Sequence, residues 1–256
     1  MQIKNLTLQL SHQVAQYRAK NFISKSSYEL ILRDMPPALF LYWQDVAPSE
    51  FPGIPQNAFF FARASEGLMR FFDCVTCSKQ ACALPSKAAD SVWHAWNKYS
   101  SISLDHFCIK HFGRTIPHIE ATEMPRSLEN ALAACLMAAR NQDRISEFSA
   151  EVPALFTLDA RLKMPHGYAY QNNIGKLGYR NLSFLGVPEG SFHFPQSFQP
   201  TEMLALGLIS EQSFEIMQEQ ALARARNNPA SQMTDSSSTG GVSCGSSCGS
   251  SCGSSS

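Results

Sequence analysis

The spacing of hydrophobic residues over the first 150 positions predicts helices separated by proline-containing loops. The segment 58–75 carries large apolar residues on one stripe, and Asn57 marks its start. Pro85 and Ser86 open a second helix over 87–99. A short helix is expected over 28–32, stopped by Pro36 and Pro37, and a loop holding Pro48, Pro52 and Pro55 is expected to follow it. Two more helices are expected later. One runs over 104–112, capped by Ser103 and ended by Gly113, and the other over 128–142.

The pattern changes after Pro153, where glycines and prolines alternate with aromatic residues and no helical period holds. Short strands are predicted over 167–171 and 181–187, and a last helix over 201–228, broken near Gly207. The predicted fold is therefore mainly α, with a smaller irregular α+β part toward the C-terminus. The predicted domains are a helical domain over 1–150, an irregular α+β region over 151–228 and a disordered Cys/Gly/Ser tail over 229–256.

Composition and charge narrow the classes of partner. Hydrophobic residues make up 44% of the 256 residues, which is enough for a buried core, and charged residues only 16%. The chain has 21 Lys and Arg against 21 Asp and Glu, without a basic run, so we expect no nucleic-acid partner. No apolar run reaches the roughly 18 residues that a membrane helix needs, so we expect no membrane partner.

The cysteines point to a reducing compartment. Five lie in the body of the chain and three in the tail, so each group is odd. The N-terminal residues lack the pattern of a secretory signal. Together these features argue against a secreted disulfide framework and predict reduced thiols in a cytoplasmic protein.

The segment 85–118 carries an unusual set of residues in order: Pro-Ser, Asp, Trp-His, Phe-Cys, Phe-Gly and a closing His. In this order it resembles the bacterial branch of the glycine-rich domain-containing protein-like family. The resemblance covers about 60 residues when the preceding helix is included. It departs from the family pattern at Trp96, where another His or a Phe is usual. The resemblance implies a mostly helical domain and does not imply a reaction.

The same segment contains a candidate functional cluster. Asp90 and His94 are four residues apart and therefore lie on one face of the predicted helix. If Cys108 and His118 fold back onto that face, the four side chains suit either a metal site or a Cys–His nucleophile pair. In the alternative structural interpretation, Asp90 pairs locally, His94 bonds within the helical core and Cys108 is a small buried residue.

The remaining candidate ligands are cysteines. Cys74 and Cys77 form a C-x2-C pair, which is half of a zinc-site signature. Cys244, Cys248 and Cys252 recur every four residues in a Gly/Ser tail, where soft ligands on a flexible strand suit zinc or copper. The tail thiols could equally crosslink chains, undergo modification or have no specific role.

From these features we expect a cytoplasmic binding or scaffold protein linked to metal or thiol chemistry, with a protein partner among the candidates. The first alternative is an enzyme using Asp90, His94, Cys108 and His118. The second is a carrier of a C-terminal segment whose Cys and Ser residues are modified after translation. No GxGxxG, P-loop or GxSxG motif occurs, so nucleotide-dependent and serine-hydrolase functions have no motif support.

Overall fold

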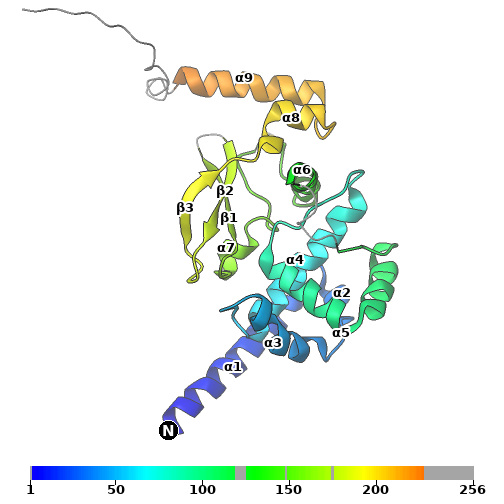
Figure 1. Ribbon diagram of the computed structural model, residues 1–256, viewed down its shortest axis with the longest axis vertical. Coiled ribbons are helices and arrows are strands. Elements are labelled where there is room, and N and C mark those ends of the chain that lie inside the picture. The colour runs from blue at the N-terminus through cyan, green and yellow to red at the C-terminus, as the bar shows by residue number, and fades with distance from the viewer. Residues whose placement is uncertain (1, 119–124, 148, 174–175, 228–256) are drawn as a thin grey trace, which may run out of the picture. The chain divides into compact units, whose positions relative to one another are not determined.

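The computed structural model describes residues 2–118, 125–147, 149–173 and 176–227 (Figure 1). Residues 1–218 form one compact unit, and a second unit begins at Glu219, within the last helix. The elements in chain order are α1 (Gln2–Ile23), α2 (Glu29–Arg33), α3 (Leu39–Glu50), α4 (Ala58–Cys77), α5 (Lys87–Phe112), α6 (Pro125–Gln142), α7 (Leu158–Leu162), β1 (Tyr168–Asn173), β2 (Lys176–Leu182), β3 (Pro188–His193), a 3-10 turn (Gln196–Phe198), α8 (Pro200–Ala205) and α9 (Glu211–Asn227).

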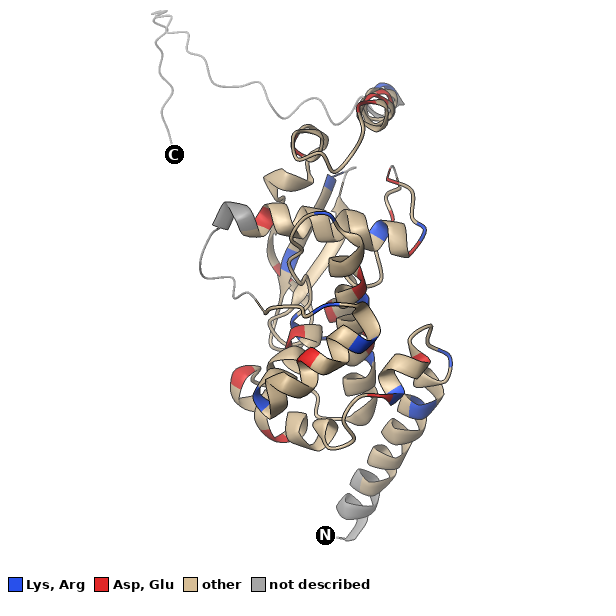
Figure 2. Ribbon diagram, turned by 90° about the vertical axis from the view of Figure 1, so that its right-hand side faces the viewer, with Lys and Arg blue, Asp and Glu red and all other residues tan. Residues whose placement is uncertain are grey.

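This architecture confirms the predicted fold class, mainly helical with a small sheet toward the C-terminus. The predicted domain boundary at residue 150 stays a prediction, and the predicted tail over 229–256 lies outside the described residues. None of the described helices is long and apolar enough to cross a membrane. Figure 2 shows basic and acidic residues interspersed along the described helices. The expected lack of a nucleic-acid partner stays a prediction.

Helices α4 and α5 pack against each other and supply much of the core. Helix α4 starts after Asn57, as predicted, and Asn57 caps it by accepting a hydrogen bond from the Phe60 backbone N–H at 2.9 Å. Trp93 of α5 packs against the rings of Phe71 and Phe72, with ring centroids 5.4 and 5.2 Å away. Gly67 allows α4 to approach α7 closely, because a Cβ there would overlap the side chain of Leu158.

Helix α5 joins two segments that the sequence predicts as separate helices. Ser86 caps its start by accepting from the Ala89 N–H at 3.2 Å, and Gly113 ends it at φ 76°. Between them the backbone leaves the helical region at Ser100, with φ −170° and ψ 102°. The Ser100 hydroxyl accepts from the Ser103 N–H at 3.1 Å, so Ser100 is the internal cap and the predicted cap at Ser103 is wrong.

The predicted loop after Pro37 is wrong over 39–50, where the chain forms helix α3. Leu39, Trp43 and Ala47 recur every four residues and are all buried, which gives this helix a core-facing stripe. Pro48 lies in the last turn of α3, where it cannot donate to the carbonyl four residues earlier, and the helix ends two residues after it. The indole N–H of Trp43 donates to Ser91 Oγ of α5 at 3.1 Å.

The sheet is antiparallel, with strand order β1-β2-β3. The predicted strand over 167–171 corresponds to β1, whereas most of the predicted strand over 181–187 is the turn between β2 and β3. The Ser183 backbone N–H closes that turn by donating to the Val187 carbonyl at 2.8 Å, and Gly186 adopts φ 69° within it. The predicted break of the last helix near Gly207 is confirmed, since Gly207 at φ 66° lies between α8 and α9.

One buried carboxylate joins the sheet region to the helices. Asp159 of α7 is 1% exposed and accepts four hydrogen bonds. The donors are the Ser86 hydroxyl at 2.6 Å and the backbone N–H groups of Lys87 at 3.0 Å, Ala88 at 3.0 Å and Tyr168 at 3.1 Å. Burial raises the pKa of Asp159, and these hydrogen bonds oppose the rise. The carboxylate thus satisfies the free N–H groups at the start of α5 and fixes the first residue of β1.

We expect Asp159→Asn to lower the free energy of unfolding by about 2–4 kcal/mol, because an amide group would face donors with its own N–H2 and leave buried groups unpaired. Urea unfolding followed by circular dichroism measures the change. Asp105→Asn, at an exposed position of α5, is the matched control and should change stability by about 0.5 kcal/mol or less. Equal stability of the two variants would contradict the role given to Asp159.

Candidate metal centre and its pocket

Three potential metal ligands converge where α5 meets the segment that follows it. Asp90 and His94 are one turn apart on α5, and Asp90 Oδ1 lies 3.6 Å from His94 Nε2. His118 returns to the same face, with its Nε2 3.0 Å from Asp90 Oδ1. One ligand atom from each residue lies within 4.8 Å of the other two. The structure therefore brings together three of the four residues in the cluster that we predicted.

Glu50, the last residue of α3, holds His94 from the other side. Its Oε2 lies 2.7 Å from His94 Nδ1, while its Oε1 pairs with Lys98 Nζ at 2.5 Å. Partial burial raises the pKa of Glu50, but hydrogen bonds from Lys98 and His94 outweigh this and leave it below the usual value. An ionised carboxylate can only accept, so His94 Nδ1 donates to Glu50 and Nε2 is the ring nitrogen that faces Asp90.

His118 is oriented by aromatic packing as well as by Asp90. Its ring meets the His94 ring edge-on, with centroids 4.6 Å apart, and the Trp93 ring in the same manner at 4.5 Å. Trp93 is buried in the hydrophobic core, so one side of the His118 ring packs against a core residue. Both imidazoles are partly exposed, with 26% of the His94 side chain and 18% of the His118 side chain accessible. A solute can therefore reach them.

The three ligands lie at the edge of a pocket of about 550 Å³. Its floor and walls come from both α5 and the sheet, which the Asp159 carboxylate holds together. Lys87 and Arg114 contribute positive charge to the lining, and Cys82 and Leu132 line it as well. The Lys87 ammonium lies over the Tyr168 ring, 5.2 Å from its centroid. The pocket thus combines an apolar surface with two cations and the three potential ligands.

Tyrosines from the sheet form the aromatic wall of this pocket. Tyr168 and Tyr170 are two residues apart in β1 and therefore share one face of the strand, and Tyr170 pairs directly with Tyr179 of β2. The Tyr179 ring centroid lies 5.4 Å from that of Tyr168 and 5.2 Å from that of Tyr170. Burial raises the pKa of all three phenols, so they stay neutral and can act as hydrogen-bond donors at neutral pH.

The structure does not bring Cys108 into the cluster. Cys108 is 1% exposed in the core, and only Asp90, His94 and His118 form a close group of potential ligands among the described residues. Burial raises the pKa of the Cys108 thiol to about 12, with a further contribution from Asp105. A thiol in this state is a poor nucleophile, so the predicted Cys–His pair loses its nucleophile.

The other predicted cysteine ligands are not gathered either. Cys74 and Cys77 lie on α4, but Cys74 is buried and Cys77 is exposed, so the two thiols lie in different environments. Neither belongs to a close group of three or more potential ligands in the part of the chain that the structure describes. Cys244, Cys248 and Cys252 lie outside the described residues.

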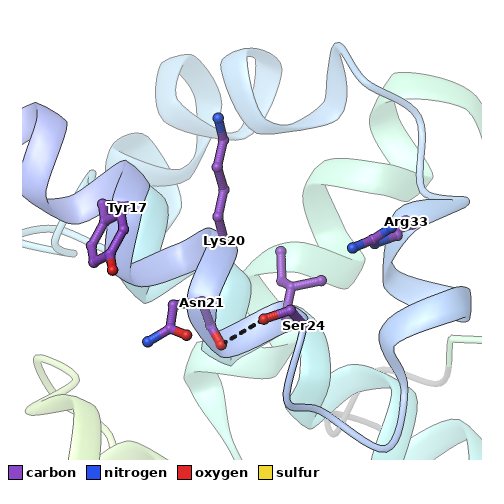
Figure 3. Close-up of a pocket in the computed structure, with 6 residues that line it drawn as sticks. Tyr17, Lys20, Asn21, Ser24 and Arg33 are labelled. Atoms are coloured by element: carbon purple, nitrogen blue, oxygen red, sulfur yellow. Dashed lines mark hydrogen bonds between the residues drawn. The ribbon is translucent and has the colours of Figure 1, made fainter.

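A second hollow, of about 560 Å³, lies beside the end of α1 and has no such convergence (Figure 3). Tyr17, Lys20 and Arg33 point in different directions there, and the Ser24 hydroxyl donates to the Asn21 carbonyl at 3.1 Å. Arg33 already pairs with Glu29 at 2.7 Å. We therefore place the candidate site at the pocket beside Asp90, His94 and His118.

Comparison with known proteins gives one family relationship without a stated activity. Residues 60–183, just under half of the chain, are similar to a family described as UCP032817-like. This range contains Asp90, His94, His118 and the three tyrosines, but Glu50 lies before it. No curated protein and no solved structure matches the chain significantly.

We expect Cys108 to resist alkylation in the folded protein. With a pKa of about 12, roughly one Cys108 in ten thousand is a thiolate at pH 8, and the side chain is buried. Iodoacetamide treatment followed by peptide mass spectrometry should find the exposed Cys77 labelled and Cys108 unlabelled, whereas both should be labelled after denaturation. Rapid labelling of Cys108 in the folded state would restore it as a candidate nucleophile.

Proposed function

We propose that the protein binds a divalent transition-metal ion through Asp90, His94 and His118 and uses it to hold a small ligand in the adjacent pocket. The observation that carries this proposal is the convergence of the three ligand atoms within 4.8 Å at the pocket edge. The proposal takes up the metal-linked binding function expected from the sequence and uses three of the four residues of the predicted cluster. The second observation is the Glu50 carboxylate 2.7 Å behind His94, an arrangement typical of metal-ligating histidines.

Two imidazoles and one carboxylate favour zinc among the ions considered from the sequence. Copper remains the alternative, and soft thiolate ligands would favour it more strongly than this set does. His118 Nε2 and Asp90 Oδ1 lie 3.0 Å apart, so an ion bound by both atoms would replace the hydrogen bond that joins them. Three protein ligands leave a coordination position free in a tetrahedral site, and the pocket is the open side.

The lining suggests the class of ligand. Lys87 and Arg114 favour an anionic group, while the wall of Tyr168, Tyr170 and Tyr179 favours a flat apolar body. Taken together, these groups fit a small aromatic or unsaturated carboxylate whose oxygen completes the coordination of the ion.

The enzyme alternative keeps the same ion and changes its task. A metal that holds water at its free position lowers the pKa of that water and generates a nucleophile at neutral pH. The position open toward the pocket favours this candidate, and Cys108 has no role in it. The third hypothesis, modification of the Cys/Ser/Gly tail, concerns residues outside the described part of the chain and stays a prediction.

Two further proposals from the sequence remain. We propose that residues 85–118 relate to the bacterial branch of the glycine-rich domain-containing protein-like family, supported by the order of the motif residues. We also propose a cytoplasmic location, supported by the described cysteines, which are all free thiols.

Metal binding is tested with the full chain carrying Cys244→Ser, Cys248→Ser and Cys252→Ser, which removes the tail thiols. Calorimetric titration with zinc should show one ion per chain. Asp90→Asn, His94→Ala and His118→Ala should each abolish or strongly weaken binding, and Glu50→Gln should weaken it about 10–100-fold by releasing His94. His106→Ala, at an exposed position of α5 outside the cluster, is the matched control. Zinc affinity unchanged by His94→Ala and His118→Ala would refute the proposed centre.

Ligand binding is tested with benzoate as the probe, in the zinc-loaded and the zinc-free protein. We expect tighter binding to the zinc-loaded form, because the carboxylate can then ligate the ion. Lys87→Ala should weaken the binding by removing a cation from the pocket wall, whereas Lys20→Ala, in the hollow beside α1, should not. Tighter binding without zinc, or equal effects of the two substitutions, would contradict the assigned pocket.

A further inference from the structure

Three cysteines from separate parts of the chain meet behind the pocket. Cys74 belongs to α4, Cys135 to α6 and Cys82 to the segment 78–86 between α4 and α5. The Cys135 thiol interacts with the thiols of both Cys74 and Cys82. The Ala83 N–H donates to the Ala131 carbonyl at 3.0 Å, which ties the segment to α6 one turn before Cys135. The contact between Cys82 and Cys135 is therefore anchored by the backbone.

The three thiols differ in access. Cys74 is 1% exposed and Cys135 is 0% exposed, whereas Cys82 is partly exposed and lines the pocket. The Cys74 thiol donates to Gln142 Oε1 at 3.9 Å, away from the pocket lining. A small reagent that enters the pocket therefore meets Cys82 first, and Cys135 is a thiol next to it that is hidden from solvent.

The electrostatic environment also sets Cys82 apart. The interaction with Cys135 lowers the pKa of Cys82, and Ser78 and Arg114 lower it further, which together outweigh the effect of burial. The Arg114 guanidinium is held nearby by a hydrogen bond to the Val75 carbonyl at 2.8 Å. Burial raises the pKa of Cys135 well above the usual value. Cys82 is therefore ionised more readily than an ordinary thiol, and Cys135 less readily.

A metal site is a poorer explanation of these thiols. Among the described residues, only Asp90, His94 and His118 bring three potential ligand atoms within 4.8 Å of one another. Cys135 contacts each of its neighbours, but the three sulfurs do not form such a group. A structural metal site normally needs four ligands, so chemistry between one pair of thiols explains the contact of Cys82 with Cys135 better.

We propose that Cys82 and Cys135 form a reversible disulfide when a hydroperoxide enters the pocket. The Cys82 thiolate attacks the terminal oxygen, so that an S–O bond forms, the O–O bond breaks and the alcohol leaves after taking a proton. The Cys135 thiol then transfers its proton to the hydroxyl oxygen of the neighbouring Cys82 sulfenic acid. As the S–O bond breaks and water leaves, the Cys135 sulfur, now without its proton, forms the S–S bond. Two thiols are oxidised and one hydroperoxide is reduced to alcohol and water. A dithiol reductant reverses the change.

This inference does not depend on the metal centre. It uses none of the three metal ligands, and it requires only that a small oxidant reach the pocket. Cys82 lies in a segment without helix or strand, so it can adjust to the geometry that a disulfide needs. Oxidation would join this segment covalently to α6 and fix one wall of the pocket.

The experiment uses the full chain with the three tail cysteines changed to serine. The protein is treated with tert-butyl hydroperoxide, blocked with N-ethylmaleimide, digested without reduction and analysed by mass spectrometry. We expect a crosslinked peptide pair containing Cys82 and Cys135, lighter by two hydrogens and separated again by dithiothreitol. In Cys135→Ala, Cys82 should stop at the sulfenic acid and be trapped by dimedone.

Cys77→Ser is the matched control, because it removes an exposed thiol close to Cys82 in sequence and should leave the crosslink unchanged. Iodoacetamide labelling of the untreated protein needs no core substitution, and it should modify Cys82 before Cys135. An unmodified Cys82 after peroxide treatment would overturn the proposal. So would a crosslink of Cys82 to Cys77 or Cys74, or a crosslink between Cys74 and Cys135.

Discussion

The arrangement of the pocket depends on one buried carboxylate. Asp159 binds three N–H groups and one hydroxyl that belong to two different parts of the fold, the start of α5 and the start of β1. A buried charge of this kind is tolerated only when it is fully hydrogen-bonded, and this requirement fixes the positions of its donors. The potential metal ligands of α5 and the tyrosines of the sheet face one pocket because Asp159 holds both elements.

The candidate centre is assembled in a similar way from elements with different tasks. Helix α5 supplies Asp90 and His94, which lie on one face because they are four residues apart in the same helix. The segment after Gly113 returns His118, and the end of α3 supplies Glu50, which fixes the tautomer of His94. The ligands thus come from one rigid helix and one returning segment, and the carboxylate behind them comes from a third part of the chain. In many metal sites a carboxylate that does not touch the ion orients a ligating histidine in this way.

Local signals made part of this structure predictable from the sequence. Asn57, Ser86 and Gly113 act through their own backbone neighbours, so the helix ends that they mark could be found directly. Helix α3 was missed because Pro48 suggests a loop, although the spacing of Leu39, Trp43 and Ala47 indicates a helix. Glu50 was lost with it. The contacts of Tyr179 and Cys135 depend on strand register and helix packing, for which the sequence carries no local sign. The place of Cys108 relative to His94 also has no local sign in the sequence, because the bend at Ser100 redirects the chain between them.

The fold leaves no space for a side chain at Gly67. The place where α4 approaches α7 has no room for a methyl group, and the side chain that would be displaced is Leu158, the neighbour of Asp159 in sequence. Gly167 sets a second limit, since a Cβ there would lie 2.6 Å from Asp159 Oδ2. A side chain at Gly67 would therefore displace the neighbour of Asp159, and a side chain at Gly167 would displace Asp159 itself. A larger residue at either position would shift the Asp159 carboxylate away from its hydrogen-bond donors at the start of α5. These donors lie one turn before Asp90, the first ligand of the candidate centre.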